Sequence, residues 1–217
     1  MKKTFVKVLY TPKLEDPVLI AGFPGIGGVG VTVAKMLIEF SQATLFGSLF
    51  SPNFQDFVFI DKNGVCHPPK YEFYAAKRDR DLIILTGNGA PSLEDIYGHF
   101  EVCGAILDFV KKNGCRLIIA VDGTPASAVD DRIFVSGTSE DIISKCAEVG
   151  AAIYSNKIAI GLPGLLLGLA KKHGLEGVYI LAPVSSIERD RKAAFKAYKF
   201  LMAILKSLSE DNAGLHS

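Results

Sequence analysis

Short continuous apolar runs alternate with longer segments of helical spacing along most of the chain. Four runs are apolar enough for strands that are covered on both faces, at residues 18–21, 81–85, 117–121 and 177–181. Helical segments are expected at residues 29–40, 92–113, 138–150, 161–173 and 185–208. Strands that alternate with helices predict an α/β fold, a three-layer α/β/α arrangement with a mostly parallel sheet.

The block at residues 51–80 departs from this alternation, because it shows no helical spacing. Its apolar run at residues 57–60 is followed by Asn63-Gly64, a dipeptide typical of a tight hairpin turn. We therefore expect a small antiparallel, β-rich insertion at 51–80 inside a single α/β domain that spans residues 1–208. Residues 209–217 are polar and predict a flexible tail.

Cap residues indicate where the helices begin and end. Ser92, Thr138 and Ser185 each stand three residues before an acidic residue, the spacing of a capping box, and are expected to open helices. Glycines follow three of the helical segments and are expected to end them, at Gly114, Gly150 and Gly174.

A glycine-rich loop joins the first covered strand to the first helix. Its segment Gly25-Ile-Gly27-Gly-Val-Gly30 fits G-x-G-x-x-G, which in a strand–loop–helix unit can hold a phosphate. The next apolar run, at residues 43–50, lacks the acidic residue that a dinucleotide site requires. A tight turn in which glycine allows close packing is the favoured interpretation, and a small-ligand or anion pocket stays open.

Three predicted strand ends meet at one edge of a parallel sheet, where such folds bind ligands. Asp122 ends one of these strands and fits either a catalytic carboxylate or a turn-forming residue. The candidate crevice consists of Gly22, Phe23, Pro24, Gly25, Gly27, Gly28, Asn88 and Asp122.

The chain shows no complete catalytic set. It lacks a G-x-S-x-G nucleophile elbow, and no second carboxylate pairs evidently with Asp122. A zinc site would need His99 and Cys103, four residues apart on a predicted helix, to meet Cys66 and His67, and nothing in the sequence brings these pairs together. We expect no metal and no cofactor, and a binding role is favoured over an enzymatic one.

Composition limits the partners and the compartment. The chain of 217 residues is 49% hydrophobic and 22% charged, with a net charge of +1, so it has no general attraction to nucleic acid or to a membrane surface. No apolar run is long enough to span a bilayer, and the first residues do not form a signal peptide. The four cysteines form no C-x-x-C motif, which favours reduced, buried thiols in a cytoplasmic protein.

The last predicted helix carries basic residues beside its apolar stripe. Arg191, Lys192, Lys196 and Lys199 share much of the polar side. Both an ordinary amphipathic surface helix and a basic docking face fit this pattern.

Several segments resemble the PAC2 family of proteasome-assembly-chaperone-like proteins. In the family pattern G-x-P-G-[IM]-G-x-V-G the chain matches from Gly22 to Gly30. Further agreement lies in Ser51-Pro52-Asn-Phe54, in residues 81–87, and in Gly161-Leu-Pro-Gly164 with the apolar residues that follow. The resemblance covers about residues 17–182.

The resemblance implies an α/β/α fold similar to nucleoside-phosphorylase and hydrolase-like folds, homo-oligomerisation, and binding to proteasome α subunits during assembly of the α ring. Many chaperone members of the family dock through a C-terminal hydrophobic-Tyr-X motif. This chain ends in Leu215-His216-Ser217, so that histidine replaces the tyrosine.

The first hypothesis is therefore a cytoplasmic, non-enzymatic, homo-oligomeric protein that assists proteasome assembly and uses residues 215–217 as a docking tail. The alternative is an enzyme or sensor that binds a nucleoside or phosphate in the glycine-lined crevice.

Overall fold

The computed structural model describes residues 3–125 and 131–214. Five α-helices are present in this part of the chain: α1 (Val29–Ser41), α2 (Ile96–Lys112), α3 (Glu140–Glu148), α4 (Leu162–Lys172) and α5 (Arg191–Gly214). A short 3₁₀ helix, η1 (Ile26–Gly28), precedes α1. The strands are β1 (Phe5–Val8), β2 (Val18–Gly22), β3 (Thr44–Phe50), β4 (Phe59–Ile60), β5 (Cys66–His67), β6 (Tyr71–Ala76), β7 (Leu82–Gly87), β8 (Leu117–Pro125), β9 (Phe134–Gly137), β10 (Ala152–Ile153) and β11 (Glu176–Val184).

The described strands form one large sheet in the order β1-β3-β6-β7-β2-β8-β11-β9-β10 and a separate hairpin of β4 and β5. The four central strands, β7, β2, β8 and β11, are mutually parallel. Strands β1, β3 and β6 pair in antiparallel fashion on one side, and β9 pairs antiparallel with β11 on the other. The predicted α/β class is confirmed.

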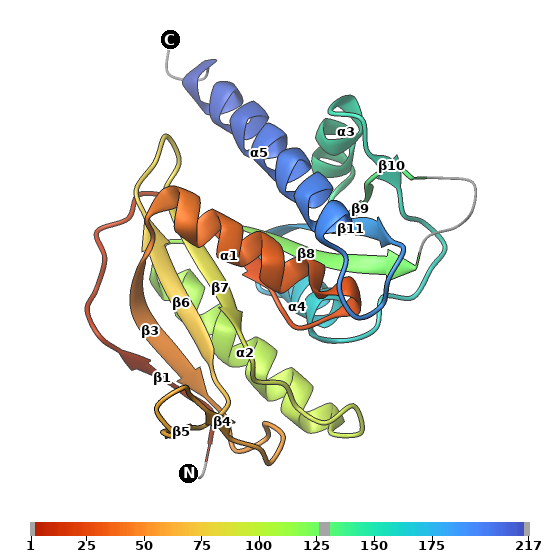
Figure 1. Ribbon diagram of the computed structural model, residues 1–217. Coiled ribbons are helices and arrows are strands. Elements are labelled where there is room, and N and C mark those ends of the chain that lie inside the picture. Colours follow the sequence, from red (N-terminus) through yellow and green to blue (C-terminus); the bar gives the residue numbers. More distant parts are fainter. Residues whose placement is uncertain (1–2, 126–130, 215–217) are drawn as a thin grey trace.

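Helices cover the sheet in two layers (Figure 1). Side chains of β2 alternate between the layers: Val18 and Ile20 belong to the apolar cluster that includes α1, α3 and α5, whereas Leu19 and Ala21 belong to the cluster that includes α2 and α4. This alternation makes every residue of β2 buried, which explains the continuous apolar run in the sequence.

The block at residues 51–80 holds two different structures. The hairpin of β4 and β5 turns at Gly64, which has a φ of 79°, as the Asn-Gly pattern predicts. The antiparallel character of the block is confirmed, but β6 is a strand of the main sheet rather than part of a separate insertion. The pairing of β6 with β3 and β7 is set by the tertiary structure and cannot be derived from the sequence pattern of this block.

Three of the predicted helix starts are wrong by a few residues. Asp95 rather than Ser92 caps α2, since its side chain accepts a hydrogen bond from Gly98 N at 2.8 Å. Ser139 rather than Thr138 precedes α3. Asp190 rather than Ser185 caps α5, accepting a bond from Ala193 N at 2.9 Å. The predicted stops at Gly114, Gly150 and Gly174 are confirmed by their positive φ angles.

The last helix is longer than the sequence pattern indicates. We expected it to end near Leu208, but α5 continues to Gly214. Its C-terminal end extends away from the rest of the fold (Figure 1). The predicted docking residues Leu215, His216 and Ser217 lie outside the described residues.

Candidate functional site

The glycine-rich loop between β2 and α1 is a place of close backbone packing. A Cβ on Gly22 would lie 2.2 Å from the Gly30 carbonyl oxygen, and a Cβ on Gly30 would lie 2.5 Å from the Val121 carbonyl oxygen. Any side chain at these two positions would push α1 away from β2 and β8. The close-packing interpretation of the motif is therefore confirmed.

The loop is also held from its other side. Gly27 and Gly28 adopt positive φ angles of 65° and 58°, which residues other than glycine rarely adopt. Gly27 N donates to the Ile187 carbonyl at 2.7 Å, and Asp190 N donates to the Gly27 carbonyl at 2.9 Å. The segment between β11 and α5 thus fastens the loop to the rest of the chain.

Asp122 lies beneath this loop and is 8% exposed. Its carboxylate accepts hydrogen bonds from Gly123 N at 2.7 Å, from the Tyr179 hydroxyl at 3.2 Å and from the backbone of Ile26. A Cβ on Gly25 would lie 2.3 Å from Asp122 Oδ1, so glycine is needed to admit the carboxylate. Through its bond with Ile26, the Asp122 carboxylate holds the glycine-rich loop against β8.

Burial shifts the pKa values of Asp122 and of its hydrogen-bond partner Tyr179. It raises the pKa of Asp122 to about 6, although the three hydrogen bonds oppose that shift. Burial also raises the pKa of the Tyr179 phenol, and the neighbouring carboxylate adds to the effect. Asp122 therefore titrates in a pH range where an acid–base residue would be useful.

The remaining candidate residues are used in different contacts. Asn88 Oδ1 accepts from Lys70 N at 2.9 Å, which joins the end of β7 to the segment before β6. The Phe23 ring is buried edge-on against Tyr71 at a centroid distance of 5.2 Å. Pro24 is exposed. The structure brings Gly25 and Asp122 together, while the described contacts of Asn88 do not include Asp122.

The pairs considered for zinc do not assemble. Cys66 and His67 lie in β5, where the His67 ring is 3.1 Å from Asp61, whereas His99 and Cys103 lie on α2. Among the described residues, no group of three or more metal-binding side chains is present. Cys103, Cys115 and Cys146 are buried as expected, but Cys66 is exposed because its strand belongs to the projecting hairpin.

One feature that sequence reasoning missed is an apolar surface at the carboxyl edge of the parallel strands. The hairpin follows β3 and the first turn of α2 follows β7, and both strands end at this edge. The two segments are linked by a hydrogen bond from Gln55 N to the Ala90 carbonyl at 3.0 Å. The exposed apolar residues of these two segments are Phe57, Val58, Phe59, Ile60, Val65, Leu93, Ile96, Tyr97 and Phe100.

The available sequence signal for this surface was the apolar run at 57–60, because all four residues of a predicted hairpin strand outside the main sheet are apolar and such runs are normally buried. On α2, by contrast, the apolar spacing of Ile96, Tyr97 and Phe100 is the same as that of a core face. Within the described residues, no helix has both the length and the apolar character needed to cross a bilayer.

Comparison with known proteins gives concordant relatives. A model of the PAC2 family matches residues 19–215. A structure of Pyrococcus furiosus PbaB, described as an archaeal proteasome activator, is 34% identical, covers 100% of this chain and 96% of that chain, and superposes with a TM-score of 0.88. Pyrococcus furiosus PbaA, described as an archaeal homolog of proteasome-assembly chaperone, shares the fold at 24% identity, with coverages of 93% and 86% and a TM-score of 0.76. An uncharacterized protein of Methanocaldococcus jannaschii is 27% identical over 191 residues, which are 87% of this chain and 73% of that protein.

Proposed function

Because the chain belongs to the PAC2 family, we propose that it is a non-enzymatic proteasome-associated protein that binds proteasome α subunits. The observation that carries this proposal is the 34% identity to the archaeal proteasome activator PbaB over the whole chain. Such a role requires a protein-binding surface rather than a reaction centre. The exposed apolar residues of the carboxyl edge supply a surface of that kind.

The contacts of the glycine loop support the non-enzymatic role. The carboxylate of Asp122 receives three donors from its own chain, and the backbone of Gly27 is bonded to Ile187 and Asp190. Groups that are paired in this way hold a loop rather than a substrate. We interpret the family's glycine motif as a structural joint between β2, α1 and β8.

Docking would use the end of the chain. Residues 215–217 follow α5, whose C-terminal end extends away from the sheet (Figure 1). Leu215 supplies the apolar side chain of the family's docking pattern, and His216 occupies the tyrosine position. We propose that Leu215 enters a pocket between α subunits, with the imidazole replacing the phenol.

The experiment is native mass spectrometry of the protein mixed with α subunits of the same organism. Three forms are compared: the full chain, a form that lacks residues 215–217, and His216→Tyr. We expect a complex with the full chain, a weaker one with the shortened form, and an equal or tighter one with His216→Tyr. Absence of any complex would contradict the proposed function, and an undiminished complex with the shortened form would reject tail docking alone.

A second candidate function has one observation in its favour. The Asp122 carboxyl lies beside the glycine-rich loop that precedes the N-terminus of α1, and burial raises its pKa to about 6. A nucleoside- or phosphate-binding enzyme or sensor would use this arrangement. Thermal denaturation with inorganic phosphate and with nucleosides checks it: a saturable rise in Tm that Asp122→Ala removes would favour this candidate, and no change would exclude it.

A further inference from the structure

A small cavity lies between β9, α4 and the segment that joins β10 to α4. It has a volume of about 240 Å³, and none of the crevice residues predicted from the sequence lines it. We name it the α4–β9 cavity. The lining residues that carry the argument are Ser136, Thr138, Tyr154, Lys157, Leu167 and Lys171.

Glycines shape the walls of the α4–β9 cavity. Gly164 closes the second glycine-proline segment that the chain shares with its family, and a Cβ there would lie 2.7 Å from the Ala159 Cβ. Glycine thus lets the segment before α4 approach the helix. Ser136 Oγ donates to the Tyr154 carbonyl at 2.6 Å, which fastens the same segment to β9. At Gly168, by contrast, a Cβ would meet no atom within 4 Å, so the space beside this part of α4 stays open.

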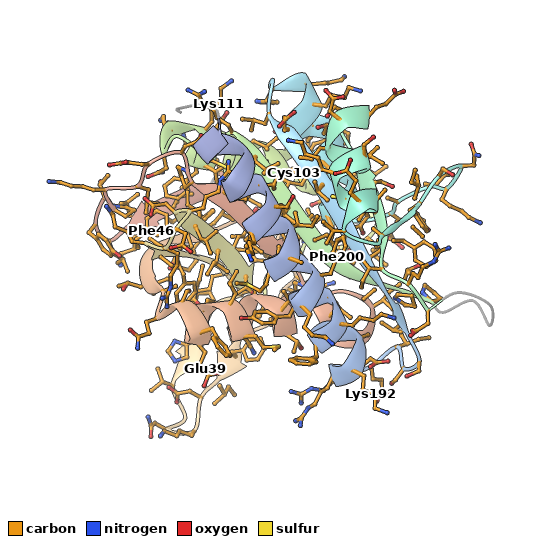
Figure 2. All side chains as sticks on the ribbon, turned by 90° about the horizontal axis from the view of Figure 1, so that it is seen from above. Glu39, Phe46, Cys103, Lys111, Lys192 and Phe200 are labelled. Atoms are coloured by element: carbon orange, nitrogen blue, oxygen red, sulfur yellow. The ribbon has the colours of Figure 1, made fainter. Side chains whose placement is uncertain are left out.

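The cavity is cationic. Lys157 from the segment before α4 and Lys171 from α4 both line it, and none of the described lining residues is acidic. Neither lysine forms an ion pair within the part of the chain that the structure describes. The basic helix α5 lies in the opposite layer, where Figure 2 shows Lys192 near one end, so its cations belong to a different surface. Two ammonium groups at one small cavity repel each other, and a bound anion would offset that repulsion.

The rest of the lining combines a hydroxyl donor with an apolar wall. Thr138 Oγ1 accepts a hydrogen bond from Gly177 N at 2.9 Å, which orients the hydroxyl and leaves its own proton for an acceptor. Leu167 and Tyr179 are buried and belong to the apolar cluster of the α2–α4 layer. An occupant that fits this lining carries an anionic group toward the lysines and a short carbon body toward Leu167.

We propose that the α4–β9 cavity binds a small phosphate monoester. A phosphate monoester carries a charge of about −1.5 to −2 at pH 7, which matches two lysines, whereas a single carboxylate would leave one ammonium group without a counter-charge. Drug-sized ligands occupy pockets of about 300–1,000 Å³, so this cavity suits a phosphate with a few carbon atoms and is too small for a nucleotide.

In this arrangement Lys157 and Lys171 pair with the phosphate oxygens, and Thr138 donates a hydrogen bond to one of them. The occupant also contacts Tyr179, whose hydroxyl is bonded to Asp122 at 3.2 Å. The cavity is therefore connected, through one side chain, to the carboxylate that holds the glycine-rich loop.

The first test is isothermal titration calorimetry of the full chain with glycerol 3-phosphate, inorganic phosphate and glycerol. We expect saturable binding of one glycerol 3-phosphate per chain, weaker binding of inorganic phosphate, and none of glycerol. Lys157→Met and Lys171→Met should each weaken binding of glycerol 3-phosphate by at least about tenfold. Lys172→Met changes the neighbouring exposed lysine of α4, which does not line the cavity, and should bind as the wild type does.

The second test fills the cavity without changing its charge. Gly168→Leu places a side chain in the open space and is expected to abolish binding. Gly104→Leu is the matched control, because Gly104 lies on α2, away from the cavity, and a Cβ there would also meet no atom within 4 Å. Circular dichroism checks that both variants are folded.

Three results would overturn the proposal. The first is a wild type that gives no saturable heat with glycerol 3-phosphate. The second is unchanged affinity in Gly168→Leu or in the variants of both lining lysines. The third is an equal loss of affinity in Lys172→Met, which would assign the binding to general attraction of anions by α4.

Discussion

Strands β7, β2, β8 and β11 lie between two helix layers, whereas β1, β3 and β6 pack mainly against α2 on one face. The difference is visible within single strands. All five residues of β2 are buried, but in β6 the buried Tyr71 and Phe73 alternate with the half-buried Glu72 and Tyr74. The central strands are parallel and the flanking strands antiparallel, which is the distribution expected when only antiparallel strands can leave one face to water.

The comparison indicates that the central strands supply most of the apolar core, whereas polar side chains gather on the flanking strands. In the central strands, both faces contribute to the apolar core. In the flanking strands, the face away from α2 carries polar residues, which are the exposed Lys7, the half-buried Glu72 and the buried Ser48. Glu72 accepts a hydrogen bond from the Tyr74 hydroxyl at 3.0 Å. We therefore expect substitutions in the central strands to affect unfolding much more than substitutions on this open face.

The largest difference is expected for Ile20→Ala in β2. Removal of this fully buried side chain leaves a cavity between β2 and the helix layer and should lower the free energy of unfolding by about 2–5 kcal/mol. Phe5→Ala on β1, where the ring is 43% exposed, should cost less than about 1 kcal/mol. Urea denaturation monitored by circular dichroism measures both. Equal losses of unfolding free energy in the two variants would contradict the distinction between the central and the flanking strands.

The next effect concerns pH, and it isolates one carboxyl of the central half. Because the folded-state pKa of Asp122 is raised to about 6, the folded protein binds more protons than the unfolded chain between pH 4 and 6. The contribution of this group therefore falls as pH rises through that range, by about 2–3 kcal/mol at 1.4 kcal/mol per pKa unit. Asp122→Asn should remove this slope. Denaturation curves at several pH values check it, and an unchanged slope would contradict the assignment.

A smaller effect is expected at the cap of α5, the helix that covers the central half. Asp190 accepts bonds from Ala193 N, Ser185 Oγ and Ser185 N, and these bonds lower its pKa to about 2. Asp190→Ala should cost about 0.5–2 kcal/mol. Since the folded pKa is lowered, this stabilisation is present above about pH 4 and is lost as pH falls toward 2. Thermal denaturation at pH 7 and pH 3 measures it, with Asp190→Asn as the conservative control.

The smallest effect belongs to the open face. Lys70 Nζ lies 2.6 Å from Glu72 Oε1, and both side chains are partly exposed. Lys70→Met should change the free energy of unfolding by less than about 1 kcal/mol, and the difference should decrease in high salt. Parallel denaturation curves at low and high ionic strength give this value. A loss as large as that of Ile20→Ala would remove the distinction between the two halves.

Local sequence patterns were enough to predict the alternating elements, because glycine and apolar runs act within a few residues. The packing of Gly22 against Gly30 follows from a motif of nine residues. The cap of α5 was not predictable in this way: Ser185 fits a capping box, but its hydroxyl is bonded to Asp190, which is the true cap. Several local patterns compete there, and tertiary contacts select one.

The function of Asp122 could not be predicted from its neighbours, since Tyr179, one of its donors, lies 57 residues farther along the chain. The same limit applies to β6, whose place in the sheet depends on pairing with β3 and β7. The exposure of the apolar residues Ile96, Tyr97 and Phe100 at the start of α2 was not predicted for another reason. Helical spacing of apolar residues identifies a face but does not say whether that face meets the core or solvent.

The strand order has a consequence for synthesis. The partners of β2 are β7 and β8, so its two edges stay unpaired until residues 82–87 and then 117–125 have been made. Translation at about 5–20 residues per second leaves this apolar segment incomplete for roughly 5–20 s after it is made. Unpaired apolar edges are templates for aggregation. Nascent chains that pause before β8 are therefore the forms of this protein most in need of protection by the cell's folding machinery.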